Sequence, residues 1–316
     1  MHRIGYLLTE GFQVMALGTQ TVFEFANVVA REPVYCVTNY SIAGGDRRAS
    51  VGAAVATLPA ELDAADSWMV SGIVDPTDRP THPDEVSFLK DVSSRARRLV
   101  GMCTGAFALG DAGLLDNRRV TTHWAFADAL KSRCPLAKVD MDRIFVVDGT
   151  IWTSAGLTAA MDLALGMVEK DLGPEIASRV AHVLVMHHRR SGGQSQHSEM
   201  LKLAPKSDKV QTALEFVRKN LAKPLRIADM AHAANLSTRQ FQRVFQSETG
   251  ESPSRAVERI RLETARNLVE RGRHSLEVIA RETGFRDRRH LREVFQRTFG
   301  AAPRTLRRDA REVDAG

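Results

Sequence analysis

The chain has 316 residues, of which 43% are apolar and 26% are charged, a composition typical of a soluble globular protein of about two domains. It contains no run of 18 apolar residues, which excludes a transmembrane helix, and its first residues enter a strand-like segment without the apolar stretch of a signal peptide. The three cysteines, Cys36, Cys103 and Cys134, form neither a disulfide framework nor a Cys-x-x-Cys metal pattern. These features predict a protein of the reducing cytoplasm.

The net charge of +6 is unevenly distributed along the chain. Residues 206–316 carry 24 lysines and arginines against 15 acidic residues, a net charge of +9. Residues 1–205 carry 20 basic and 23 acidic residues, a net charge of −3. A basic third joined to a slightly acidic remainder favours one module that faces a polyanion and one that does not. A solvated helical surface rich in arginine and glutamate would give the same balance.

The first two hundred residues alternate strand-like and helix-like segments, which predicts a doubly wound α/β fold with a parallel sheet covered on both faces. The predicted strands are 4–8, 34–37, 68–70, 99–102 and 144–147. The predicted helices are 22–29, 85–97, 106–112, 125–131 and 158–169.

Residues 101–105, at the end of the fourth predicted strand, read Gly-Met-Cys-Thr-Gly. This is a cysteine version of the nucleophile elbow, in which small flanking residues permit a sharp, strained strand-to-helix turn that lifts the central side chain over the sheet edge. The N-terminus of the following helix is expected to lower the pKa of Cys103 and to offer N–H groups to an anion. The alternative interpretation is a small buried hydrophobic residue, the commoner role of a lone cysteine.

The basic third contains an internal repeat with a period of fifty residues. The same residue types recur in three pairs: Val-Phe-Gln at 244–246 and 294–296, glycine at 250 and 300, and proline at 253 and 303. Two copies of one small helical unit are therefore expected.

Each copy is predicted to contain a short helix, a turn and a second helix. In the first copy, 227–231 form the short helix, and Ser237 is the N-cap of the second helix, with Gln240 completing a capping box. In the second copy, Gly284 makes the turn and Asp287 is the N-cap. Apolar side chains at helical spacing are expected to be buried in the two second helices: Phe241, Val244, Phe245, Leu291, Val294 and Phe295.

Basic and amide side chains occupy the opposite face of both second helices. They are Arg239, Gln242 and Arg243 in the first copy, and Arg288, Arg289 and Arg292 in the second. This is helix-turn-helix anatomy, in which the outer face of the second helix enters the DNA major groove. Arginine and glutamine suit that face because they make bidentate contacts to guanine and adenine edges.

Residues 209–308 resemble the AraC/XylS family of bacterial transcription regulators, whose Phe-x-x-x-Phe-Gly-x-x-Pro ending is present at 295–303. The resemblance implies an all-α double helix-turn-helix domain that binds double-stranded DNA in successive major grooves and works with RNA polymerase. It also implies base-reading roles for the six arginines and glutamines named above. Glu293 departs from the family, which usually carries arginine there, and a carboxylate at this position cannot contact a phosphate favourably. A helical bundle with arginine-rich solvent faces is the alternative.

The first two-thirds resemble the ThiJ/PfpI-like branch of the class I glutamine amidotransferase-like superfamily, a flavodoxin-like fold. The matching segments are 103–109, 112–116, 121–124, 147–149 and 152–156. The two resemblances together identify the chain as similar to GlxA-family transcriptional regulators. They imply a sensing domain at 1–188, a linker at 189–208, a DNA-binding domain at 209–308 and a tail at 309–316. Homodimerisation is expected by analogy.

Catalysis is not expected of the first domain. Ala16 stands where hydrolytic relatives carry an acidic residue, Thr104 stands where protease-like members carry histidine, and nothing visible would orient His123 as a base. The pocket is instead predicted to bind a small metabolite. Family resemblance makes this an amine, a betaine or an amino acid. The predicted ligand contacts are Cys103, Thr104, His123, Gly72 and Trp124.

Two other functions remain open: a cysteine hydrolase, amidase or hydratase with a DNA-binding tail, and a redox sensor acting through Cys103. No Walker or Rossmann motif is present, so no nucleotide cofactor is expected. His187 and His188 lack matching ligands nearby and are interpreted as a polar helix end, not a metal site.

Overall fold

The computed structural model describes residues 1–186, 192, 196, 207–270, 272 and 274–308. The chain divides into two compact units, which we call the α/β unit (1–192) and the helical unit (193–315). His187, His188, the predicted tail and most of the predicted linker lie outside the described residues. The domain boundaries at 188 and 209 therefore stay predictions. In the described part of the chain, none of the helices is both long and apolar enough to cross a membrane.

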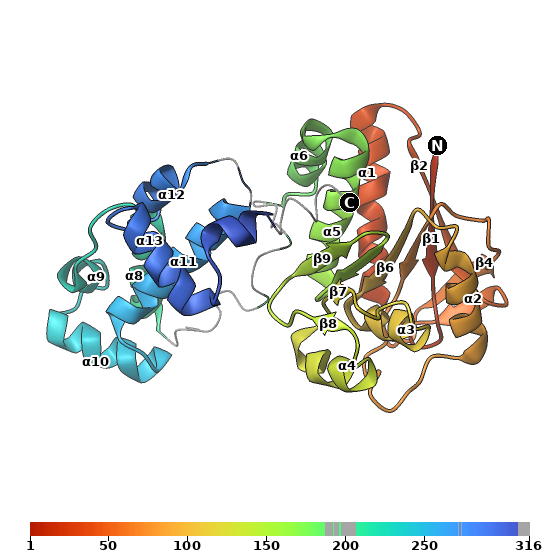
Figure 1. The fold of residues 1–316 in the computed structure, drawn as a ribbon, viewed down its shortest axis with the longest axis horizontal. Helices are drawn as coiled ribbons and strands as arrows, with labels where there is room; N and C mark the ends of the chain where they lie inside the picture. The colour runs from red at the N-terminus through yellow and green to blue at the C-terminus, as the bar shows by residue number, and fades with distance from the viewer. Residues whose placement is uncertain (187–191, 193–195, 197–206, 271, 273, 309–316) are drawn as a thin grey trace. The chain divides into compact units, whose positions relative to one another are not determined.

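The α/β unit is built on one eight-stranded sheet (Figure 1). In their order across the sheet, the strands are β3 (Gly45–Arg48), β4 (Ala54–Pro59), β2 (Tyr35–Ser41), β1 (His2–Leu7), β5 (Ser67–Val70), β6 (Arg98–Met102), β10 (Ile151–Ser154) and β9 (Phe145–Asp148). The six inner strands are parallel, and β3 and β9 pair antiparallel with their neighbours at the two edges. A short pair, β7 (Arg119–Val120) and β8 (Lys138–Val139), lies apart from the main sheet.

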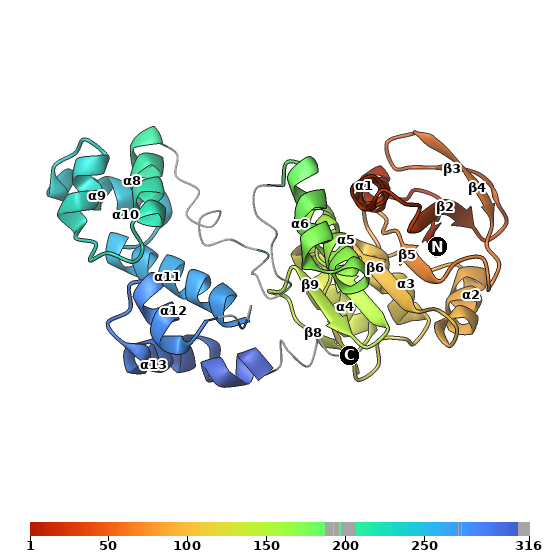
Figure 2. The same ribbon diagram turned by 90° about the horizontal axis from the view of Figure 1, so that it is seen from above.

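Helices cover both faces of this sheet, so the predicted doubly wound fold is confirmed. Helices α1 (Gln20–Ala30), α5 (Leu157–Leu172) and α6 (Pro174–Val183) lie on one face, and α2 (Pro83–Ser93), α3 (Ala106–Asp111) and α4 (Ala127–Arg133) lie on the other (Figures 1 and 2). On the second face, Trp68, Leu89 and Leu109 are buried in one apolar core between the sheet and its helices.

One predicted strand does not run parallel to its neighbour in the sheet. Residues 144–147 were expected to run parallel, but β9 forms an antiparallel hairpin with β10. The hairpin is tight because Gly149, at φ 59°, supplies the left-handed backbone that a short connection between antiparallel strands requires. Strands β3 and β4 are not predicted from the sequence because most of their side chains are polar or exposed, so no apolar run marks them.

The helical unit consists of two helix-turn-helix motifs that share one long helix. The elements are α8 (Asp208–Lys219), α9 (Ile227–Ala233), α10 (Thr238–Thr249), α11 (Pro253–Glu270), α12 (Leu276–Glu282) and α13 (Arg288–Phe299). Helix α11 contributes Ala256 and Ile260 to the first core and Ala265 and Val269 to the second. The predicted all-α domain with two copies of one motif is confirmed.

Candidate functional site

The turn at Cys103 has the strained geometry that the sequence predicts. Strand β6 ends at Met102, and Cys103 adopts φ 55°, a left-handed conformation that costs a residue other than glycine about 1–3 kcal/mol. The flanking glycines permit the turn, because a Cβ on Gly105 would lie 2.3 Å from the carbonyl oxygen of Val70. A Cβ on Gly101 would lie 3.0 Å from the backbone of Ala106. The side chain of Cys103 is half-buried at this turn.

The expected lowering of the Cys103 pKa is wrong. Burial raises the pKa of the thiol to about 11, and the hydrogen bond from the backbone N–H of Thr104 opposes this only in part. Desolvation of the thiolate therefore outweighs the hydrogen bond that would stabilise it. At neutral pH Cys103 is a protonated thiol, which is a poor nucleophile.

We expect alkylation of Cys103 by iodoacetamide to be slow at neutral pH and to rise about tenfold for each pH unit up to about pH 10, because only the thiolate reacts. Mass spectrometry of the Cys103 peptide, with an unstructured cysteine peptide in the same tube as the reference, measures this. A half-maximal rate reached below about pH 8 would contradict the raised pKa and would restore the cysteine hydrolase as a candidate.

Gly72 and Thr104 lie against each other beside this turn. The side chain of Thr104 is 2% exposed, and its Oγ1 donates a hydrogen bond to the carbonyl of Ile73 at 2.6 Å. A Cβ on Gly72 would lie 2.2 Å from Thr104 Oγ1 and 2.9 Å from the Thr104 backbone nitrogen. Gly72 therefore allows the loop after β5 to pass directly over the short helical turn at Cys103–Gly105, which leads into α3.

His123 and Trp124 lie on the segment that follows β7. The neighbouring Thr122 donates a hydrogen bond from Oγ1 to the carbonyl of Cys103 at 2.9 Å, which ties this segment to the cysteine turn. Nδ1 of His123 accepts a hydrogen bond from the backbone N–H of Ala125 at 3.3 Å, so this imidazole caps the short helical turn at Trp124–Phe126. Trp124 is 50% exposed, and its ring centroid lies 5.5 Å from that of His123.

A cavity of about 160 Å³ lies on the side of the turn that faces α2 and α3. Gly72 and Thr104 line it, whereas Cys103, His123 and Trp124 do not. Arg79 and Glu85 also line the cavity, and no motif in the sequence marks either of them. A signal for Glu85 was present, because it shares the helical spacing of Phe88, Leu89 and Val92 and so places a carboxyl group on the apolar face of α2.

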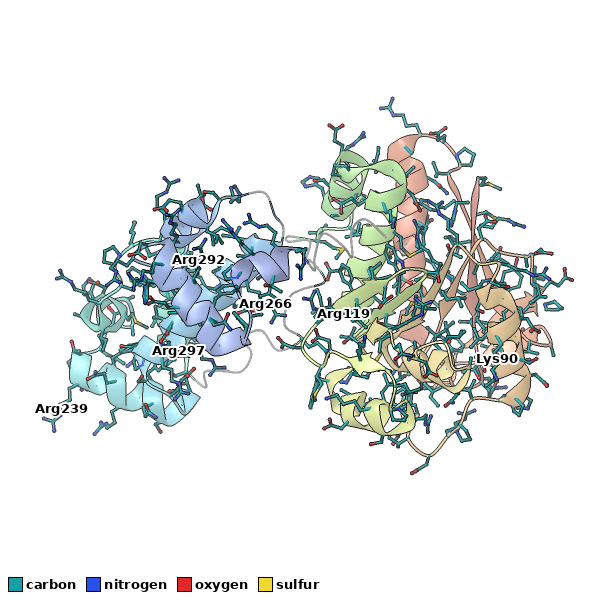
Figure 3. All side chains as sticks on the ribbon, viewed as in Figure 1. Lys90, Arg119, Arg239, Arg266, Arg292 and Arg297 are labelled. Carbon is teal, nitrogen blue, oxygen red and sulfur yellow. The ribbon has the colours of Figure 1, made fainter. Side chains whose placement is uncertain are left out.

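The predicted base-reading residues of the first motif lie together on one exposed face of α10. Ser237 and Gln240 form the predicted capping box at the start of this helix, and Phe241 and Phe245 are fully buried on its inner face. Arg239, Gln242 and Arg243 are exposed on the other side, and Figure 3 shows Arg239 pointing away from the unit. Among the described residues, no ion pair engages either of these arginines.

The same face of α13 is exposed but partly neutralised. Asp287 caps this helix by accepting from the backbone N–H of His290 at 2.7 Å, and Arg288, Arg289 and Arg292 are exposed. Nε of Arg289 donates to Glu293 at 3.0 Å, one helical turn along. Glu293, the departure from the family pattern, therefore offers an intramolecular partner to one of the three arginines. We call α10 and α13 the recognition helices below.

Both units match known families. The helix-turn-helix domain family matches residues 230–309, and the DJ-1/PfpI family matches residues 59–170. The HTH-type transcriptional regulator GlxA of Rhizobium meliloti is 32% identical, over 98% of this chain and 96% of its own. The HTH-type transcriptional regulator GbdR of Pseudomonas aeruginosa is 29% identical, over 96% of this chain and 83% of its own.

Among solved structures, an AraC family transcriptional regulator from Pseudomonas putida superposes with a TM-score of 0.54 at 24% identity. The match spans 58% of this chain and 100% of that one. At this identity the match supports the fold alone.

Proposed function

Because this chain belongs to the GlxA family of helix-turn-helix transcriptional regulators, we propose that a small molecule held by its α/β unit controls how its helical unit binds specific DNA. The observation that carries the DNA-binding half is the pair of capped recognition helices, each with an exposed arginine face opposite a buried aromatic one. Phosphate contacts would supply most of the affinity and its salt dependence, and the recognition helices would supply the base preference.

The site in the α/β unit is proposed to hold an amine, a betaine or an amino acid. Gly72 and Thr104 support this proposal because they line a cavity. Contacts of the ligand with Cys103, His123 and Trp124 stay predictions. They are tested by asking whether Cys103→Ala changes the stabilisation that a ligand confers in thermal unfolding. An unchanged stabilisation would remove the cysteine from the binding site.

We propose that the α/β unit is not an enzyme. Ala16 is 6% exposed at the position where hydrolytic relatives carry an acid, and burial raises the pKa of the Cys103 thiol. The same raised pKa disfavours a redox sensor, since oxidation proceeds from the thiolate. A homodimer in the cytoplasm that acts together with RNA polymerase is the expected setting of the regulator.

We expect Arg243→Ala and Arg292→Ala each to reduce discrimination between bases by about 1–3 kcal/mol, which is the value of one bidentate contact. The DNA probe is the duplex that the full chain selects from a random pool. Fluorescence anisotropy at fixed salt measures the affinity of each protein for this duplex and for its single-base variants. Exposed Lys209, on α8, is the matched control, and Lys209→Ala should leave base preference unchanged. Weakening that is uniform over all sequences would show that Arg243 and Arg292 contact phosphates instead.

A further inference from the structure

Two side-chain hydroxyls that line the cavity beside Gly72 have no proton left to give to a ligand. Ser71 Oγ donates its proton to the carbonyl of Leu7 at 3.1 Å, and Thr104 Oγ1 donates its proton to the carbonyl of Ile73 at 2.6 Å. A hydroxyl group carries one proton, so both of these buried groups present only lone pairs to the cavity.

Glu85 adds a carboxyl group to this end of the cavity. Glu85 is 5% exposed, and among the described residues no cation lies within ion-pairing distance of its carboxylate. Burial raises the pKa of the carboxyl, while a hydrogen bond from Thr9 and, to a smaller extent, the charges of His82 and Arg79 lower it. A buried carboxylate without a paired cation is costly, and a cationic N–H donor placed in the cavity would offset that cost.

The mouth of the cavity has the opposite character. Arg79 is exposed there, and no hydrogen bond or ion pair joins its guanidinium to another described side chain. Nδ1 of the exposed His82 accepts a hydrogen bond from the backbone N–H of Asp84 at 3.3 Å and lies 3.5 Å from the Asp84 carboxylate, so Nε2 is the ring nitrogen that remains available to a ligand. Both side chains therefore present donors at the mouth, where an anionic group would be recognised.

Apolar side chains, among them a single phenyl ring, line the wall between these two ends. Phe107 and Ala108 are buried in the wall. The guanidinium of Arg133 already lies 5.1 Å from the centroid of the Phe107 ring. A quaternary ammonium group is recognised chiefly by aromatic faces, whereas acceptor groups of the kind found here recognise an ammonium that carries N–H protons.

We propose that this cavity binds a small α-amino acid, with its ammonium on Glu85, Ser71 and Thr104 and its carboxylate toward Arg79 and His82. The inference rests on the proposed function, since the amino acid would be the effector. The volume of about 160 Å³ restricts the ligand to a small one. The site distinguishes an amino acid from a betaine, which carries the same two charges but no N–H.

The test uses thermal unfolding and calorimetric titration of the full chain with glycine, L-alanine, L-serine and L-proline. Ethylammonium and propionate supply the two separate charges, and glycine betaine supplies a zwitterion without N–H. At least one amino acid should raise Tm, and the three comparison compounds should raise it little. Glu85→Gln keeps the shape and the hydrogen bond with Thr9, and it should weaken Kd by about tenfold to a hundredfold, as loss of a charge-assisted contact does.

Arg79→Gln changes an exposed residue and should weaken Kd similarly without lowering Tm of the free protein. Glu24→Gln and Arg179→Gln, at exposed positions on α1 and α6, are the matched controls and should bind as the wild type does. The proposal is overturned if no amino acid binds, if glycine betaine binds as tightly, or if Glu85→Gln and Arg79→Gln bind normally. The same preparation is also tested for selection of a specific duplex from a random pool. If it selects one while no amino acid binds, the amino-acid proposal fails and the proposed DNA-binding function stands.

Discussion

Gly284→Ala is expected to destabilise the helical unit by about 3–5 kcal/mol and to abolish binding to the selected DNA. Gly284 lies in the turn before α13 at φ 72°, where a side chain is strained by about 1–2 kcal/mol. Its Cβ would also lie 2.2 Å from the carbonyl oxygen of Leu221 and 2.7 Å from the guanidinium carbon of Arg261. Because Leu221 belongs to the first motif and Gly284 to the second, the clash would push the two recognition helices apart.

Arg261 makes this contact rigid. Its Nη2 donates a hydrogen bond to the carbonyl of Lys223 at 2.7 Å, which holds the guanidinium in place beside Gly284. Gly300→Ala is the matched control, because Gly300 has φ 66° and no atom within 4 Å of its Cβ position. It should cost about 1 kcal/mol. Denaturant unfolding followed by circular dichroism, together with anisotropy on the selected duplex, measures both variants. Equal effects of the two substitutions would show that the packing at Leu221 does not set the geometry.

Asp171→Asn is expected to cost the α/β unit about 3–5 kcal/mol, the usual cost of breaking a buried ion pair. The side chains of Asp171 and Arg98 are 6% and 3% exposed. Two nitrogens of Arg98 donate to the two oxygens of Asp171, at 2.9 and 2.5 Å. Arg97 and the hydroxyl of Tyr35 also donate to this carboxylate, at 2.6 and 3.0 Å. Removing the charge would leave the buried Arg98 without its counter-ion.

The stability conferred by Asp171 should depend on pH in a defined direction. Burial opposes ionisation of Asp171, but the hydrogen bond and charge of Arg98, with the charge of Arg97, hold its pKa below the ordinary value. The contribution is therefore complete above the unfolded pKa of about 3.9 and is lost as the pH falls through the lowered folded value. The free-energy difference between wild type and Asp171→Asn should be constant near neutrality and shrink below about pH 4.

Asp66→Asn provides the comparison for this pair. Asp66 pairs with Arg3 at 2.7 Å, but their side chains are 33% and 48% exposed. Its loss should cost at most about 1 kcal/mol. Denaturant unfolding across the pH range measures both variants. If Asp171→Asn costs no more than Asp66→Asn, the Asp171 network does not stabilise the α/β unit.

Local signals in the sequence were sufficient to predict most elements of the helical unit. The capping box of Ser237 and Gln240 and the buried Phe241 and Phe245 follow from spacing alone, and the structure confirms each of them. The parallel strands at the centre of the sheet were also predictable, because they are short, apolar and regularly interrupted by helices.

The features that could not be predicted from the sequence depend on contacts between distant segments of the chain. The pKa of Cys103 is set by burial, which no local motif encodes, so the elbow was recognised while its chemistry was misjudged. The close approach of Gly284 to Leu221 spans 63 residues of the chain. The charged lining of the cavity likewise arises only when the loop after β5 meets α2 and α3.

Hydroxyl-radical footprinting of the full chain on its selected duplex tests the central claim most directly. Two recognition helices that enter successive major grooves should protect two segments on one face of the DNA, separated by about 10 base pairs. Arg243→Ala and Arg292→Ala should each relax the base preference within one segment and leave the other intact. A single protected segment, or protection without any sequence preference, would contradict a regulator that reads DNA with both helices.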